Sequence, residues 1–555
     1  MNAKRILIVG GVAGGAACAA RLRRLDEHAE IVMFDRGPHV SFANCGLPYY
    51  IGGVIPSEED LLLADVDLFR DRFHIHVHPR TEVLSVDREQ QTITVRDLAT
   101  GEERAERYDA LVLSPGASPL RPPLPGIDLP GIFTLRNIPD SNAIKQWIAA
   151  REARSAVIVG AGFIGLEMAE NLVHLGMEVT VVEMLDQVMP PLDPEMAAMV
   201  AERLRQHDVQ LALGDGVAGF SEQENGEKGK LSVRTQSGSE YPADLVILSI
   251  GVRPETGLAK DAGLDIGERG GIRVNGQMQT SDPRIWAVGD AVEVRDAITG
   301  NAALVPLAGP AARQGRVAAE AICGRSSTFR PVQGTAICEV FGLQVATTGA
   351  SEKALRRAGW ENFEKVHLHP AHHVAYYPGA KRMQLKLLFD KESGRILGAQ
   401  GIGEAGVDRR IDVISMVIQK QGTIHDLAEA ELCYAPQFGG AKDAVNFVGM
   451  TAENVLDGDL PQVHWNAPAG DDTLFLDVRD PVEFAGGHLP GARNIPLGTL
   501  RENLGELPKD ADIRVYCAVG QRGYLATRIL LQHGLRARNI PGGWSLRPYV
   551  VGNAG

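Results

Sequence analysis

Two copies of one local pattern constrain what this chain can fold into. Each copy is a buried strand, a glycine-rich turn, a helix and a second strand that ends in an acidic residue. In the second copy, strand 156–159 leads into a complete G-x-G-x-x-G turn over 160–165, and strand 178–182 follows the helix. Such glycines let the backbone approach a pyrophosphate at a helix N-terminus, while the acid accepts a ribose hydroxyl. The predicted dinucleotide contacts are Gly160, Gly162, Gly165 and Glu183.

The first copy, over residues 5–35, is less regular. Its turn follows strand 6–9, and Val12 replaces the middle glycine of the strict pattern. A glycine-rich turn that binds no ligand is therefore the alternative, although strand, turn, helix, strand and acid are all in place. The predicted contacts are Gly10, Gly11, Ala13, Gly14, Gly15 and Asp35.

The residues after the second acid indicate which nicotinamide cofactor fits. Glu183 would repel a ribose 2′-phosphate, and Met184 and Leu185 supply no arginine to receive one. We therefore expect NADH, with NADPH disfavoured.

Composition excludes several classes of function. The 555 residues suggest three or four domains, and a net charge of −14 argues against nucleic acid or an anionic membrane as a general partner.

We find no signal peptide and no apolar run of membrane-spanning length, so we expect a cytoplasmic protein. The six cysteines form no C-x-x-C pair, and the histidines of 367–373 lack acidic or cysteine partners at ligand spacing, so we expect no metal.

A lone cysteine stands in the segment 41–49. Gly-Leu-Pro follows Cys45, and proline is tolerated in the first turn of a helix. At a helix N-terminus the dipole would favour thiolate over thiol. The next cysteine is Cys323, so a disulfide of Cys45 would form with a substrate. The alternative is a buried structural cysteine.

Two further groups of residues have both a functional and a plain interpretation. Arg21 and Arg24 share a helix face, either as solvated surface charge or as an anion clamp near Cys45. Near the C-terminus, Cys517 lies between a strand and a helix, in a loop whose N–H groups can hold an anion or an extra sulfur, and Arg522 adds positive charge. A passive buried cysteine is the alternative there.

Residues 1–447, with two consecutive dinucleotide folds and a further domain, resemble the pyridine-nucleotide:disulfide oxidoreductase family. The stretch 41–49 is similar to its single-cysteine branch, which holds coenzyme A disulfide reductases and, as cousins, NADH oxidases and peroxidases. Residues 470–555 resemble a rhodanese domain, on the motifs at 476–479 and 487–492 and on Cys517. The combination resembles reductase–rhodanese fusions that act as NADH-dependent persulfide reductases.

The resemblance implies an α/β protein with two Rossmann-like domains, an α+β dimerisation domain and an α/β rhodanese domain. The implied boundaries are 1–115 and 245–325 for the FAD-binding domain, 116–244 for the NAD(P)H-binding domain, 326–447 for dimerisation, 448–469 for a linker and 470–555 for rhodanese.

The resemblance also implies bound FAD, a homodimer, and particular site residues. The further flavin contacts are Ser114, Pro115, Gly116, Gly289 and Asp290. The coenzyme A contacts are Arg21, Arg24, Ser41, Asn44 and Arg313, and the active-site residues from the dimerisation domain are Tyr377, Tyr434, His373 and Lys442. Ala17 and Phe73 depart from the family pattern, which puts two coenzyme A contacts in doubt.

The expected function is reduction of coenzyme A persulfide, polysulfide or coenzyme A disulfide through Cys45, with Cys517 handling sulfane sulfur. One alternative is plain coenzyme A disulfide reduction with an incidental rhodanese domain. Another is oxygen or peroxide reduction, although residues 5–15 hold no histidine of the kind that the peroxidases use. In a third, the C-terminal domain is a binding or sensing module.

Overall fold

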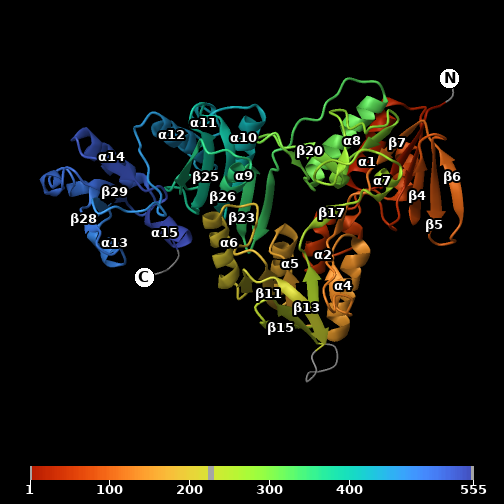
Figure 1. The fold of residues 1–555 in the computed structure, drawn as a ribbon, viewed down its shortest axis with the longest axis horizontal. Helices are drawn as coiled ribbons and strands as arrows, with labels where there is room; N and C mark the ends of the chain where they lie inside the picture. The colour runs from red at the N-terminus through yellow and green to blue at the C-terminus, as the bar shows by residue number, and fades with distance from the viewer. Residues whose placement is uncertain (1–2, 223–229, 552–555) are drawn as a thin grey trace. The chain divides into compact units, whose positions relative to one another are not determined.

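The computed structural model describes residues 3–222 and 230–551, and the chain divides into two compact units (Figure 1). The first unit comprises residues 1–186 and 208–334, and the second comprises 187–207 and 335–555.

The first unit begins with a five-stranded parallel sheet in the order β19-β7-β1-β2-β3. Its strands are nearly continuous apolar runs, as expected for a sheet covered on both faces. Helix α1 leaves the first glycine turn and packs against α8. The bounds are β1 Arg5–Val9, α1 Ala13–Leu25, β2 Glu30–Phe34, β3 Ile75–His78, β7 Ala110–Leu113, β19 Ile285–Ala287 and α8 Ala308–Ile322.

A second five-stranded parallel sheet has the order β12-β11-β10-β16-β9. Strand β16 pairs with β10 and β9, so the boundary expected at 244/245 lies too early. A buried apolar strand has the same sequence pattern in either sheet, which explains the misplacement. The bounds are β9 Ile132–Thr134, β10 Ser155–Val159, α5 Phe163–His174, β11 Glu178–Glu183, β12 Gln210–Leu213 and β16 Leu245–Leu248.

Smaller elements complete this unit as antiparallel sheets, short pairings and connecting helices. They are η1 Asn44–Gly46, α2 Leu47–Ile51, η2 Glu59–Leu61, α3 Val66–Phe73, β4 Thr81–Asp87, β5 Thr92–Asp97, β6 Glu103–Arg107, β8 Ala117–Pro119, α4 Ile138–Arg151, β13 Val217–Glu222, β14 Leu231–Thr235, β15 Glu240–Ala243, β17 Val252–Pro254, α7 Gly257–Asp261, β18 Ile272–Arg273, η3 Gly289–Ala291, β20 Val292–Arg295 and β21 Ala302–Ala303.

The second unit contains a five-stranded antiparallel sheet in the order β22-β23-β26-β25-β24. Helix α10 packs on this sheet through its apolar face, and α11 packs on α12. Helix α6, although it follows the second dinucleotide unit in sequence, belongs here. The bounds are α6 Pro194–Gln206, β22 Ala336–Val340, β23 Leu343–Gly349, α9 Glu352–Arg357, β24 Phe363–Leu368, β25 Met383–Asp390, β26 Ile396–Gly403, α10 Val407–Gln419, α11 Ile424–Ala428 and α12 Ala444–Leu456.

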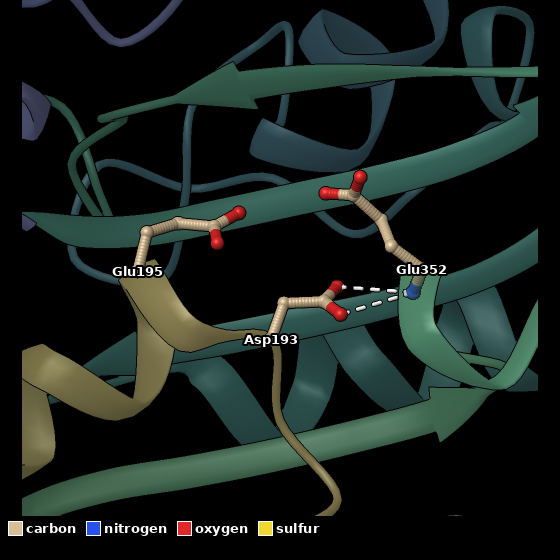
Figure 2. Close-up of side chains that lie close together, drawn as sticks. All are labelled: Asp193, Glu195 and Glu352. Carbon is tan, nitrogen blue, oxygen red and sulfur yellow. Dashed lines mark hydrogen bonds between the residues drawn. The ribbon is translucent and has the colours of Figure 1, made fainter. Parts of the chain in front are cut away.

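A buried ionic cluster fastens the start of α6 to this sheet. The carboxylates of Asp193, Glu195 and Glu352 converge (Figure 2), and the Lys386 ammonium lies 2.8, 2.5 and 2.5 Å from them. Burial opposes the charge on Glu352, but Lys386 and Lys365 outweigh it and lower the pKa of that carboxyl to about 2. A lysine therefore occupies the centre of a group that could otherwise hold a cation. Removing one partner of such a buried set costs about 3–5 kcal/mol.

The C-terminal part of this unit has a parallel sheet in the order β28-β27-β29-β30. Helix α12 occupies the first half of the segment expected as a linker, and Val463 and Trp465 pack with Tyr516 and Ile540. The linker is thus partly helical and partly built into the last domain, because its apolar residues are buried. The bounds are β27 Thr473–Asp477, α13 Pro481–Ala485, β28 Arg493–Asn494, η4 Leu497–Thr499, η5 Leu504–Glu506, β29 Asp512–Tyr516, α14 Gln521–Gln532, β30 Ala537–Asn539 and α15 Gly543–Val551.

Within the described ranges, no helix combines the length and apolar character that crossing a membrane requires.

Candidate functional site

A cavity of about 640 Å³ opens at the carboxyl ends of the first parallel sheet. The predicted residues that line it are Gly10, Ala13, Gly14, Asp35, Ser114, Pro115, Gly116, Gly289 and Asp290. Gly11 acts from beside the cavity, where its N–H donates to Asp35 at 2.8 Å. Sequence reasoning missed Arg36, His39 and Arg136, which also line it and belong to no local motif.

The shape of this cavity fits a dinucleotide. Gly10 has a φ of +93°, and a Cβ there would lie 2.0 Å from the Ser114 carbonyl oxygen. A Cβ on Gly15 would lie 1.9 Å from the Gly10 carbonyl oxygen, so both glycines are sterically required. The Nδ1 atom of His39, in the cavity wall, is buried without a hydrogen-bond partner among the described residues. An unsatisfied buried nitrogen at this place is consistent with a polar ligand.

The second glycine turn has the same construction. A Cβ on Gly165 would lie 2.0 Å from the Gly160 carbonyl oxygen, whereas one on Gly162 would meet nothing within 4 Å. The last glycine of the turn is thus needed for close packing, and the middle glycine leaves space for a ligand. Glu183 ends β11 and accepts the Ala161 N–H at 2.8 Å, which fixes its carboxylate beside the turn.

Cys45 lies in the short 3₁₀ turn η1, just before α2, and is exposed. It lines a second cavity of about 610 Å³. Ala13, Phe42 and Asn44 line both this cavity and the dinucleotide cavity. Cys45 thus lines the second cavity and follows Asn44, which lines both. Pro48 lies in the first turn of α2 as predicted.

The surroundings of Cys45 favour the thiol, whereas the sequence predicts a thiolate. Although the residue is exposed, the protein atoms around its sulfur displace water and raise the pKa of the Cys45 thiol, and the carboxylates of Glu167 and Asp290 raise it further. The following helix has only five residues, so its dipole is weak against these effects. The Tyr49 hydroxyl donates to Glu167 at 3.4 Å, and burial raises the pKa of that carboxyl to about 7. Glu167 follows the second glycine turn, but no signal in the sequence connects it with Cys45.

The predicted substrate residues separate into two groups. Ser41 and Asn44 line the cavity with Cys45, together with Ala17 and Phe73. Arg21 is instead paired with Glu320 at 2.5 Å, Arg24 is exposed, and Arg313 lies over the Phe329 ring at 5.7 Å. Arg72 of α3, next to Phe73, is the one charged side chain among the described residues that line this cavity. Arg72 belongs to no motif, so no local pattern indicates it as a substrate contact.

The dimerisation-type sheet carries the predicted tyrosines on its loops. The hydroxyl of Tyr434 lies 3.1 Å from that of Tyr376, not that of Tyr377. Tyr377 packs edge-on against His373, with ring centroids 5.4 Å apart. His373 is buried and Lys442 is exposed. Sequence reasoning thus missed Tyr376, because two adjacent tyrosines cannot be distinguished by a motif alone.

In the C-terminal part, Cys517 follows β29 and is fully buried. The Gly520 N–H donates to its sulfur at 3.1 Å. The Cys517 and Ala518 carbonyls accept from Trp544 and Ser545 at 2.7 and 2.9 Å, which fixes the loop to the start of α15. One N–H group of the loop therefore points at the sulfur, and the holding of sulfur or an anion there stays a prediction.

Arg522 lies in the first turn of α14, but it is not a free cation. Its guanidinium donates to both carboxylate oxygens of Glu483, at 2.6 and 2.7 Å. These hydrogen bonds lower the pKa of the Glu483 carboxyl to about 2. Sequence reasoning named Arg522 as an anion contact but did not anticipate this partner.

Comparison with known families covers most of the chain. The family model described as pyridine nucleotide-disulphide oxidoreductase matches residues 4–315, and its dimerisation domain matches 335–444. A rhodanese-like domain model matches residues 460–546.

Individual relatives agree with this division. A coenzyme A disulfide reductase of Staphylococcus haemolyticus is 34% identical over 453 residues, which are 81% of this chain and 100% of that protein. The solved structure of reduced Bacillus anthracis CoADR-RHD is 47% identical, with a TM-score of 0.96 over 99% of both chains. An NAD-dependent persulfide reductase from A. fulgidus is 37% identical, with a TM-score of 0.91 over 98% of this chain and 99% of that one. The chain therefore belongs to the pyridine nucleotide-disulfide oxidoreductase family, whose members use FAD and a pyridine nucleotide, and it carries dimerisation and rhodanese-like domains.

Proposed function

We propose that this protein is an NADH-dependent reductase of coenzyme A persulfide or a related organic persulfide. Cys45 is the redox-active group, and the rhodanese-like domain handles sulfane sulfur at Cys517. The observation that carries the proposal is that Cys45 lines the second cavity directly beside Asn44, a residue that lines both this cavity and the dinucleotide cavity.

The chemistry assigned to Cys45 balances in two steps. Its thiolate attacks the terminal sulfur of R–S–SH, so that a new S–S bond forms on Cys45, the S–S bond of the substrate breaks, and RS⁻ leaves. Two electrons and one proton then convert the Cys45 persulfide into thiolate and hydrogen sulfide. FAD held in the cavity lined by Gly10, Asp35 and Asp290 would supply that electron pair once NADH had reduced it. Burial raises the pKa of Glu167 to about 7, which supports a role for this carboxyl in exchanging the proton.

The second cavity suits an organic thiol. Its wall is formed mostly by small and apolar side chains, including Ala13, Ala17 and Phe69. Arg72 offers one positive charge to an acidic substrate. Coenzyme A combines a flexible thiol arm with acidic groups. The names of the relatives point to the same substrate class.

NADH is favoured over NADPH by the end of β11. The Glu183 carboxylate is fixed by the N–H groups of Ala161 and Leu185, and would repel a 2′-phosphate. The ratio of kcat/KM for the two cofactors tests this assignment.

A homodimer is proposed from the second unit. The dimerisation-domain match spans 335–444, and Tyr376, Phe438 and Tyr434 there are 73%, 62% and 47% exposed. Large exposed aromatic side chains are typical of an interface. Light scattering of the purified protein tests the expected mass of two chains.

The function is tested by NADH oxidation with coenzyme A persulfide, coenzyme A disulfide and oxygen as separate acceptors. We expect turnover with the persulfide, sulfide release in step with NADH consumed, and loss of both in Cys45→Ser. Undiminished sulfide release by Cys45→Ser would contradict the mechanism.

Coenzyme A disulfide reduction is the second candidate, favoured by the relatives that match 81% of this chain. Turnover with coenzyme A disulfide and none with coenzyme A persulfide would establish disulfide reduction as the function in place of persulfide reduction.

A further inference from the structure

The second cavity, which Cys45 lines, follows one face of helix α1. Four alanines at helical spacing share this face and line the cavity, namely Ala13, Ala16, Ala17 and Ala20. The rise of an α-helix gives this row a length of about 10 Å. A cavity that extends over such a row can hold an extended chain as well as a thiol.

The thiol lies near the start of this row. The Ser41 N–H donates to the Gly11 carbonyl at 2.8 Å, which ties the segment that carries Cys45 to the turn before α1. Asn44, the residue before Cys45, lines the cavity together with Ala13, the first residue of α1. Cys45 is therefore placed beside the beginning of α1.

Arg72, which also lines the cavity, lies toward the other end of α1. Arg23, in the last turn of α1, donates through Nε to the Phe73 carbonyl at 2.7 Å. This hydrogen bond holds the C-terminal end of α3, and with it Arg72, beside the last turn of α1. The cavity thus has its thiol near the start of the helix and its cation near the end.

The charge of Arg72 is not neutralised by its neighbours. Arg70 pairs with the other acidic residues of the same helix, Asp67 and Asp71, at 2.6 and 2.7 Å. Within the described ranges, no carboxylate pairs with Arg72 and no acidic side chain lines this cavity. A negatively charged ligand in the cavity would therefore be attracted to Arg72 without competition from a carboxylate.

The other arginines at this end of α1 are placed differently. Arg21 pairs with Glu320 at 2.5 Å, and Arg23 is buried and donates to backbone carbonyls. Arg24 is exposed, but it lies outside the set of described residues that line the cavity. Arg72 is thus the cation that a ligand inside the cavity can contact.

We infer that Arg72 is a specificity-determining residue that binds a phosphate at the far end of a long-armed thiol persulfide. The cavity thereby selects substrates by the separation between their sulfur and their phosphate. A guanidinium suits this task because it can donate two parallel hydrogen bonds to one phosphate. Coenzyme A and 4′-phosphopantetheine carry such an arm, whereas the carboxylates of glutathione lie close to its sulfur. The inference rests on the proposed attack of Cys45 on a persulfide.

The test compares the persulfides of pantetheine and 4′-phosphopantetheine, which share one arm and differ by the phosphate. NADH oxidation by the full-length protein gives kcat and KM for each persulfide. We expect the lower KM for the phosphorylated persulfide in the wild type. In Arg72→Gln, this KM should rise about tenfold with kcat unchanged, because a contact made equally in the ground state and the transition state is lost. The KM for pantetheine persulfide should stay the same.

Arg24→Gln is the matched control, because it removes an exposed arginine that does not line the cavity. This variant should leave both KM values unchanged. A rise of the phosphorylated persulfide's KM in Arg24→Gln and none in Arg72→Gln would overturn the inference. Equal KM values for the two persulfides in the wild type would overturn it as well.

Glutathione persulfide tests the selection by length. Its KM should not respond to Arg72→Gln, and a tenfold rise would show that Arg72 binds anions whatever their distance from the sulfur. If Arg72→Gln does not fold, salt provides the test. Rising ionic strength must raise the wild-type KM for the phosphorylated persulfide more than that for pantetheine persulfide, and equal responses overturn the inference. Absence of turnover with all three persulfides would instead contradict the proposed function.

Discussion

The two cysteines singled out here lie in opposite surroundings. Cys45 is exposed, precedes a five-residue helix, and has carboxylates as its charged neighbours. Cys517 is buried at the end of a strand, receives an N–H from Gly520, and has the Arg522 charge nearby. One thiol is accessible but electrostatically opposed to ionisation, and the other is enclosed and accepts a backbone N–H.

This difference indicates two different tasks. An enclosed sulfur with an N–H donor can hold a persulfide away from water. An exposed sulfur in a cavity that adjoins the dinucleotide cavity can meet both a substrate and an electron donor. Holding sulfur and reducing sulfur are therefore assigned to separate cysteines.

The largest effect should come from replacing each cysteine in turn. Cys45→Ser removes the nucleophile, so NADH oxidation with coenzyme A persulfide should fall by at least about a thousandfold. Cys517→Ser should retain most of that activity but lose sulfur transfer to cyanide. Equal losses of NADH oxidation in both variants would show that the two tasks are not separate.

A change at Gly543 should damage the Cys517 site alone. Gly543 has a φ of +58°, and a Cβ there would lie 2.4 Å from the Cys517 carbonyl oxygen. Gly543→Ala should therefore slow sulfur transfer by about a hundredfold, since a 1 Å displacement at a reacting group has that order of effect. Gly498→Ala, where a Cβ meets nothing within 4 Å, is the matched control. Undiminished sulfur transfer by Gly543→Ala would contradict the claim that the close approach at Gly543 positions the Cys517 loop.

The pKa of Cys45 should respond to Glu167. An ionised Glu167 raises that pKa, so Glu167→Gln should lower it and speed alkylation by iodoacetamide several-fold above pH 7. Because Glu167 itself ionises near pH 7, alkylation of the wild type should rise less than about tenfold per pH unit through that range. Glu431→Gln, an exposed carboxylate of the second unit, is the control. Identical pH profiles for wild type and Glu167→Gln would contradict this coupling.

A last effect, of the same order, is expected at the end of β11. Met184 is 67% exposed directly after Glu183. Met184→Arg offers a charge to a 2′-phosphate, so NADPH use relative to NADH should rise about tenfold, equivalent to about 1.4 kcal/mol. The ratio of kcat/KM for NADPH to that for NADH measures this preference. An unchanged ratio would show that the ribose does not bind beside Glu183. Sulfur transfer by Cys517 should be unaffected.

Local patterns predicted the fold well where a motif ties several elements together. The strands and helices around both glycine turns are where the sequence places them, and the close approaches at Gly15 and Gly165 explain why. The assignment of β16 to the second sheet and the helical start of the linker were missed. Each of these two features depends on the distant strand or core against which an apolar segment packs. The sequence of the segment itself does not specify that partner.

The candidate site was predicted less completely than the fold. Motifs identified Cys45, Cys517 and the cavity-lining glycines, because these residues are fixed by turns of defined geometry. They did not identify Arg72, Glu167 or Glu483. Each of these residues acts through a neighbour far away in the sequence or through a cavity wall, so no spacing in the chain predicts it.

The central claim concerns the bond that Cys45 forms. Oxidised enzyme carrying Cys517→Ser is mixed with coenzyme A persulfide in the absence of NADH, and the Cys45 peptide is weighed by mass spectrometry. If Cys45 attacks the terminal sulfur of the persulfide, we expect one added sulfur atom on Cys45 and one free coenzyme A thiol released for each Cys45. Coenzyme A itself bound to Cys45 as a mixed disulfide, or no change at Cys45, would contradict it.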